Sequence, residues 1–448
     1  MRADAMESDV NEDTATRAKP LVMHIVARLE ADSDGGNEVV ELIEAMDRTH
    51  FRHMVVALTG CDPALARRLA RCGARCIPLH YRPWLRVKVL FDLYRVFRLF
   101  QPAIVQVKDR AAIALIPAVM AHIPVRLHCV DDVDMPEMDG LPWNTWLHFR
   151  FYQLFAQQYV TSSGRVRGGL EQDAGIVPQR IKLIRTGVDS GRFHPAQGGR
   201  ESYVGSPFNS SRLIVIGSVG ALDYAHDPLR LIRAFARAKR MFGDYGARLR
   251  LVIAGDGPLR RELEFLIDRG GLSDRIWLVD GKFELPALLR SFDFFAVCSR
   301  GADISTTVLA AMASGLAVVV TRGGVQDELM KEGETGLLVP AETHEVAQAL
   351  AQLAVDTGLR LRLGQAARER VGKHFDLHDR GCLYTDFYHH CFNANGIIRE
   401  QESELPATSA AGLPLGDEDI QRAFSHVARL REKRGWMDGD EPENGGER

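Results

Sequence analysis

Residues 301–315 read GADISTTVLAAMASG and offer a candidate site for a phosphate-bearing ligand. A buried strand is predicted over 292–298, and a helix of small residues is predicted to begin near Ser305. A turn from strand to helix directs backbone N–H groups toward one point, where a phosphate can bind. Asp303, Ser305 and Thr306 stand at this turn. They face the ligand, or, in the alternative interpretation for Asp303 and Ser305, they cap the helix.

Gly35 and Gly36 follow the first predicted strand and are a second candidate site. Glycines at such a position allow a substrate to approach the backbone closely, but they are equally typical of a plain turn. Both interpretations stay open at this point.

Two series of alternating strands and helices must position these residues. The first runs from a strand at 21–29 to Pro195, and the second begins with a strand near Arg212. Strands and helices alternating at this spacing predict a doubly wound parallel sheet in each series, hence two Rossmann-like α/β domains. Ligands bind at the carboxyl ends of such strands, so we expect the two sheets to face each other across a cleft.

The boundaries between these regions follow from composition. Residues 197–212 are rich in Gly, Ser and Pro and form the clearest boundary. The predicted organisation is a disordered head at 1–20, a first domain at 21–196, a second domain at 212–374, a crossover helix at 375–396, and a linker, charged helix and acidic tail at 397–448.

The charge of the chain is unevenly distributed. Its formal net charge is -3, which gives no overall bias toward nucleic acid, and we expect no nucleic-acid partner. Residues 67–110, however, carry eleven basic side chains and two acidic ones. Such a basic block attracts an anionic membrane or a lipid diphosphate, or it is simply a solvated helical surface. The helix predicted near 84–100 places Val89 and Leu93 on its core face, with Lys88 and Arg95 opposite.

Several other classes of protein are disfavoured. The seven cysteines are scattered and do not form the paired spacing of a zinc site, so we expect no metal and a reducing compartment. The polar first 19 residues do not read as a signal peptide, and the longest apolar run, 111–125, is interrupted by Pro117 and His122. We therefore predict a cytoplasmic protein, at most peripheral at the inner membrane, without a cofactor.

Four collinear sequence blocks go beyond periodicity: GVDSGRFHP at 187–195, IAGDGPLRREL at 253–263, AAMASGLAVVVT at 310–321 and EGETGLLVP at 332–340. In order and spacing they resemble group 1, or family 4, retaining glycosyltransferases. The likeness is greatest to the sugar transferases associated with bacterial exosortase exopolysaccharide systems. The resemblance implies the GT-B fold, an acceptor on the first domain, a nucleotide-sugar on the second, and no metal.

The resemblance also implies where the donor diphosphate would bind. An Arg and, five residues later, a Lys that clamp the diphosphate correspond to Ala221, directly after Gly220, and to His226. Two glutamates that contact the transferred sugar and the ribose correspond to Ala302 and Ala310.

Other positions depart from the family in the same way. The Glu-His pair of the acceptor side corresponds to Val130 and Asp131, while Asp303 replaces a Gly and competes with phosphate for N–H groups. Arg300 is the one neighbouring cation that could replace the lost Arg. Each hydrogen bond to a charged group contributes about 1.5–3 kcal/mol, whereas a micromolar ligand has only about 8 kcal/mol in total. We therefore expect donor binding in the family's manner to be largely abolished.

Three functions are compatible with this sequence. The first is a catalytically impaired scaffold or regulatory partner of an active transferase in exopolysaccharide assembly. The alternative is an active retaining transferase that moves a hexose from a nucleotide-sugar to a lipid-linked or oligosaccharide acceptor. A nucleotide-sugar epimerase of similar fold is the third, but no set of catalytic carboxylates for it is visible.

Overall fold

A computed structural model describes residues 19–29, 34–80, 86–131, 149–241, 243–279, 283–299, 306–323 and 326–394. Arg300, Ala302, Asp303 and Ser305 lie outside these residues, as do the predicted head before residue 19 and the predicted linker, charged helix and acidic tail at 397–448. Residues Lys19–Ile397 are one compact unit.

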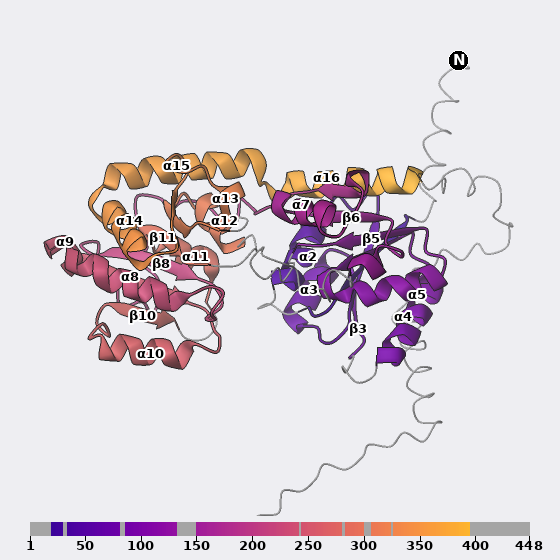
Figure 1. The fold of residues 1–448 in the computed structure, drawn as a ribbon, viewed down its shortest axis with the longest axis horizontal. Helices are drawn as coiled ribbons and strands as arrows, with labels where there is room; N and C mark the ends of the chain where they lie inside the picture. The colour runs from indigo at the N-terminus through magenta and orange to yellow at the C-terminus, as the bar shows by residue number, and fades with distance from the viewer. Residues whose placement is uncertain are drawn as a thin grey trace, which may run out of the picture. The chain divides into compact units, whose positions relative to one another are not determined.

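The first sheet has seven strands, all parallel, in the order β3-β2-β1-β4-β5-β6-β7. Figure 1 shows the fold coloured along the chain, from indigo at the N-terminus to yellow at the C-terminus. The strand order reverses between β1 and β4, because β1 pairs with both β2 and β4. All six residues of β1 are buried, as expected for a strand covered on both faces. The strands are β1 (Leu21–Val26), β2 (Arg52–Ala57), β3 (Arg75–Pro78), β4 (Ile104–Lys108), β5 (Val125–Cys129), β6 (Gln158–Thr161) and β7 (Ile181–Leu183).

Helices cover this first sheet. They are α2 (Asp34–Ala45), α3 (Pro63–Arg71), α4 (Arg86–Phe100), η1 (Asp109–Ala114), α5 (Leu115–Met120), α7 (Gly164–Gln172) and η2 (Pro178–Arg180). Gly35 and Gly36, which are typical of a turn, instead lie in the first turn of α2. Of the two interpretations left open for these glycines, the plain turn does not hold, because the helix that buries Val40 and Ile43 already begins at Asp34.

The second sheet has six parallel strands in the order β10-β9-β8-β11-β12-β13, and it reverses between β8 and β11. Its strands are β8 (Ile214–Val219), β9 (Leu249–Ala254), β10 (Ile276–Val279), β11 (Phe294–Val297), β12 (Val318–Thr321) and β13 (Leu337–Val339). The helices are α8 (Pro228–Met241), α9 (Gly243–Arg248), α10 (Arg260–Arg269), α11 (Leu285–Arg290), α12 (Thr306–Ala313), α13 (Gln326–Leu329), α14 (Thr343–Val355), α15 (Thr357–His374) and α16 (Leu377–Ala394).

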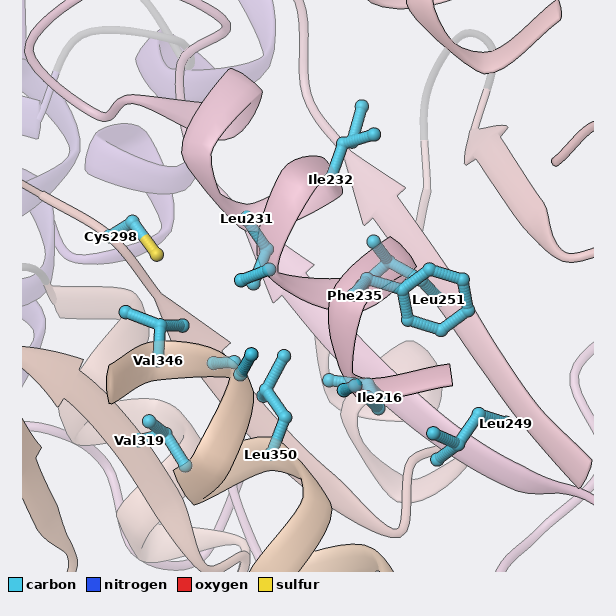
Figure 2. Packing of buried hydrophobic residues seen from close by; sticks show 14 of the residues in the cluster. Ile216, Leu231, Ile232, Phe235, Leu249, Leu251, Cys298, Val319, Val346 and Leu350 are labelled. Carbon is cyan, nitrogen blue, oxygen red and sulfur yellow. The ribbon is translucent and has the colours of Figure 1, made fainter. Parts of the chain in front are cut away.

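Helix α8 shows why this half folds as it does. Its apolar residues Leu231, Ile232 and Phe235 recur at helical spacing and pack on Ile216 of β8 and Leu251 of β9 (Figure 2). Val346 and Leu350 of α14 belong to the same core. The polar side of α8 is thereby turned away from the sheet.

Helix α16 follows the second sheet in the chain but packs on helix α2 of the first. A Cβ atom at Gly381 would lie 2.7 Å from the carbonyl oxygen of Ala45, so only a glycine permits this approach. Tyr384, Tyr388 and Cys391 of α16 join Val22 and other residues of the first sheet in one buried cluster. The C-terminal helix is therefore part of the first sheet's core.

A histidine pair is buried between β1 and β2. Nε2 of His24 lies 3.1 Å from Nδ1 of His53, and the two residues are 1% and 8% exposed. The other ring nitrogens, Nδ1 of His24 and Nε2 of His53, have no hydrogen-bond partner. Burial lowers the pKa of His53 from 6.5 to about 4. The pKa of His24 is also lowered, mainly by burial and to a smaller extent by the charge of the neighbouring His53.

We predict that this pair makes the protein acid-sensitive. As the pH falls, His53 takes up a proton near pH 6.5 in the unfolded chain but only near pH 4 in the folded chain. The free energy of unfolding therefore decreases between these two pH values. At about 1.4 kcal/mol per pH unit, His53 alone accounts for about 3 kcal/mol. Urea unfolding at several pH values measures the effect.

The control for this prediction compares two variants. The double variant His24→Leu/His53→Leu is expected to lose most of the decrease, while His374→Gln, at an exposed position of α15, is expected to keep it. An equal acid response in the wild type and the double variant would contradict the assignment.

Candidate functional site at the carboxyl edges of the two sheets

The strand orders mark two places where a ligand is expected. In doubly wound sheets, ligands bind beyond the carboxyl ends of the strands where the order reverses. These places follow β1 and β4 in the first sheet, and β8 and β11 in the second.

In the second sheet, two glycines bring the loops after β8 and β9 into close contact. A Cβ atom at Gly255 would lie 1.9 Å from the carbonyl oxygen of Gly220, and one at Gly257 would lie 2.5 Å from that of Leu222. The N–H of Gly220 donates to the carbonyl of Ala254 (3.1 Å), and the N–H of Leu222 donates to that of Asp256 (2.9 Å). The GDG sequence is thus required for packing of the loops, independently of any ligand.

His226 lies against Gly220 at this edge. A Cβ at Gly220 would be 3.4 Å from Cδ2 of His226. The ring Nδ1 of His226 is 2.8 Å from Oδ1 of Asp223, and its backbone N–H donates to the same oxygen (2.9 Å). Burial alone would raise the pKa of Asp223, but the hydrogen bonds from His226 outweigh it and lower that pKa. An imidazole hydrogen-bonded to a carboxylate therefore lies beside Gly220 at this edge.

The other predicted donor-side residues provide little chemistry. Ala221 is exposed next to Gly220, and Thr306 is the partly exposed first residue of α12. Ala310 is only 2% exposed and packs in the core on the inner side of α12. A glutamate at 310 would therefore have to bury its carboxylate.

At the edge of the first sheet, four charged side chains form a buried network. Nζ of Lys108, at the end of β4, contacts the carboxylate of Glu38 and lies 3.4 Å from Oδ2 of Asp131. Arg380 of α16 contacts the other carboxylate oxygen of Glu38. The exposed fractions of these side chains range from 4% for Arg380 to 17% for Asp131, so two cations and two anions balance almost without solvent.

This network determines what Asp131 can do. Burial would raise its pKa, but Lys108, Arg380 and the N–H of Ser162, which donates to Oδ1 (2.8 Å), together lower it. Asp131 is accordingly a carboxylate held in an ion pair rather than a proton donor. Val130, the neighbouring predicted position, is 1% exposed and packs in the apolar core of the first sheet.

Sequence reasoning missed a further carboxylate, that of Glu328 in α13. It accepts hydrogen bonds from the Ser163 hydroxyl (3.0 Å) and from the N–H groups of Gly164 and Arg165 (both 2.9 Å). Ser163 is also the N-cap of α7, so Glu328 adds a negative charge at the N-terminus of that helix. No local pattern could have indicated this, because the partners are more than 160 positions apart.

Two parallel sheets, each with a reversal in its strand order and each formed by one half of the chain, are the architecture of GT-B glycosyltransferases. HepE from Anabaena in complex with UDP-glucose superposes with a TM-score of 0.70 at 18% identity, covering 82% of this chain and 99% of that chain. WaaG, a glycosyltransferase involved in lipopolysaccharide biosynthesis, gives a TM-score of 0.64 at 14% identity, with the same coverages. At these identities the likeness concerns the fold.

Sequence comparison gives the type of protein. The family model for Glycosyltransferase Family 4 matches residues 35–192, and that for Glycosyl transferases group 1 matches residues 213–356. The D-inositol 3-phosphate glycosyltransferase of Salinispora arenicola is 30% identical over 238 residues, or 48% of this chain and 52% of that relative. The chain is of the group 1 glycosyltransferase type. It spans about half the length of the curated relatives it matches.

Two further observations apply to the described residues only. They contain no helix long and apolar enough to cross a membrane. They also contain no group of three or more His, Cys, Asp or Glu side chains arranged to hold a metal ion.

We predict that the charge network stabilises the first sheet. Lys108→Met leaves two buried carboxylates with one cation, which should lower the free energy of unfolding by about 3–5 kcal/mol, as measured by urea unfolding. Adding Asp131→Asn should recover part of that loss. Lys88→Met, at an exposed position of α4, is the control and should change stability by less than about 0.5 kcal/mol. Equal effects at 88 and 108 would contradict the prediction.

Proposed function

We propose that this protein is a GT-B scaffold with impaired donor binding, which acts as a partner of an active transferase in the assembly of a bacterial surface glycan. The observation that carries the proposal is that the carboxyl edge of the second sheet keeps its backbone geometry but has no charged side chains at two of the expected positions. The backbone approach of the loops after β8 and β9 is kept, yet Ala221 is neutral and Ala310 is buried where the resemblance implies charged groups.

The first sheet's edge supports the same proposal. A catalytic acid or base must be free to exchange a proton with the substrate. Asp131 is instead paired with Lys108 and held ionised, and removing it from that pair would leave a buried cation uncompensated. The exopolysaccharide systems with exosortase, which the sequence blocks resemble, are the setting we propose for the partner.

An active transferase is the second candidate, favoured by one observation. The His226 ring, hydrogen-bonded to Asp223, lies beside Gly220, where a donor diphosphate would lie. In this alternative the chain transfers a hexose from a nucleotide-sugar to a lipid-linked or oligosaccharide acceptor. UDP-glucose, which HepE binds, is the first donor to test.

The proposed location is the inner leaflet of the membrane, through an exposed face of α4. Phe91 and Leu99 are 63% and 57% exposed, and Lys88, Arg95 and Arg98 are exposed on the same helix. Basic side chains interspersed with large apolar ones suit an anionic bilayer surface. Not every residue of the basic block contributes, because Arg68 pairs with Glu44 (2.6 Å) and Lys108 lies in the buried network.

For donor binding, we expect isothermal titration of the wild type with UDP- and GDP-sugars to give dissociation constants no tighter than millimolar. Ala221→Arg/His226→Lys should bind at least tenfold more tightly, because each charged hydrogen bond contributes about 1.5–3 kcal/mol. Tyr224→Arg/Ala225→Lys, exposed on the same loop, adds similar charge away from Gly220 and is the control. Micromolar binding by the wild type would overturn the proposal in favour of the active transferase.

For membrane binding, we expect co-sedimentation with vesicles containing anionic lipid at low salt and its loss at high salt. At about 1 kcal/mol per basic residue, Arg95→Gln/Arg98→Gln should weaken binding about 30-fold. Arg240→Gln/Arg261→Gln removes the same charge from α8 and α10 and should have little effect. Binding that is insensitive to salt and to anionic lipid would contradict this account.

A further inference from the structure

An open cavity of about 440 Å³ lies between α8 and the beginning of α14. It is lined by charged and polar side chains from both helices and from the loops before them. The lining residues are Asp227, Arg230, Arg233, Arg237, Ala341, Glu342, Thr343 and His344. Neither the comparisons nor the resemblance assigns a ligand to this cavity.

Three arginines give the cavity its character. Arg230, Arg233 and Arg237 follow at intervals of three and four residues, which places them on one face of α8. Like charges at these spacings repel one another on a helix. The row is therefore unfavourable in itself and becomes favourable when an anion lies between the guanidinium groups.

Among the residues that the structure describes, Arg230 is the one arginine of the three that has an acidic partner. Nε of Arg230, the first arginine of the row, donates to the carboxylate of Asp227 (2.8 Å), and this contact holds the Arg230 side chain in place. Arg233 and Arg237 are exposed and have no ion-pair partner among the described residues. These two guanidinium groups are available to a ligand from solvent.

The beginning of α14 and the loop before it form the other side of the cavity. Nδ1 of His344 lies 3.3 Å from the carboxylate of Glu342, and its Nε2 lies 3.2 Å from that of Glu345, so each carboxylate has a polar contact within the chain. Glu342 occupies the N-cap of α14 without making a side-chain cap hydrogen bond. The Thr343 side chain, which also lines the cavity, adds a hydroxyl donor.

We infer that this cavity binds a small anion with two or more linked phosphate groups. A guanidinium group forms paired hydrogen bonds with phosphate oxygens, and two arginines one helical turn apart can hold neighbouring phosphates of one chain. The volume is within the range of small-molecule sites. The inference does not depend on the donor site, which lies at the edge beyond β8 and β11.

Isothermal titration of the full chain with inorganic tripolyphosphate tests the inference. We expect one ion bound per chain, with at least tenfold weaker binding by Arg233→Gln/Arg237→Gln. The control Arg261→Gln/Arg269→Gln changes the net charge equally, at exposed positions of α10 outside the cavity, and should stay within twofold of the wild type. Both arginine positions of the test variant are exposed, so both variants should fold, which circular dichroism verifies.

Two results would overturn the inference: equal weakening in the two variants, which indicates unspecific attraction, or no binding of tripolyphosphate by the wild type at millimolar concentration. A second arm identifies the source of the phosphates. Phosphatidylcholine vesicles carrying geranylgeranyl diphosphate that bind the wild type but not Arg233→Gln/Arg237→Gln indicate a lipid diphosphate. Binding of free tripolyphosphate without binding of these vesicles indicates a soluble ligand.

Discussion

The balance of four buried charges at the first sheet's edge constrains much of this structure. Glu38, Lys108, Asp131 and Arg380 come from α2, β4, the end of β5 and α16, and none of them has much contact with water. Each charge is tolerable there only because the others are present. The same interaction that fixes α16 on the first sheet also keeps Asp131 ionised. Stability requires Asp131 to stay ionised in this pair, whereas proton transfer would require it to take up and release a proton. The geometry favours stability.

The second sheet separates backbone requirements from side-chain requirements. Gly217 is fixed by the ring of Phe292, which a Cβ atom would approach to 1.9 Å, and Gly255 is fixed by the carbonyl of Gly220. These glycines are needed for the fold whether or not a donor binds. These glycines of the group 1 sequence motifs are accordingly informative about architecture.

Much of the fold was predictable because buried parallel strands are continuous apolar runs, such as β1 and β9. The strands β3 and β6 are harder to predict, because each has only four residues and β3 includes Pro78, a residue that is unusual in strands. At the candidate site, the proximity of His226 to Gly220 was predictable because both residues belong to the loop between β8 and α8. The pairing of Lys108 with Asp131, and the cap that Glu328 supplies to α7, join distant segments, and no local pattern indicates such partners.

The distribution of charge distinguishes surface recognition from chemistry at the strand ends. At the edge of the first sheet, the positive charge of Lys108 is neutralised by Glu38 and Asp131. Unpaired guanidinium groups lie elsewhere, on the outer face of α8, and exposed basic residues alternate with apolar ones on α4. Both helices bury one face in a core and leave the opposite face free for other uses. The core under α8 does not include Ala221 or His226, so the exposed face of α8 carries its row of arginines independently of the side chains at those two edge positions.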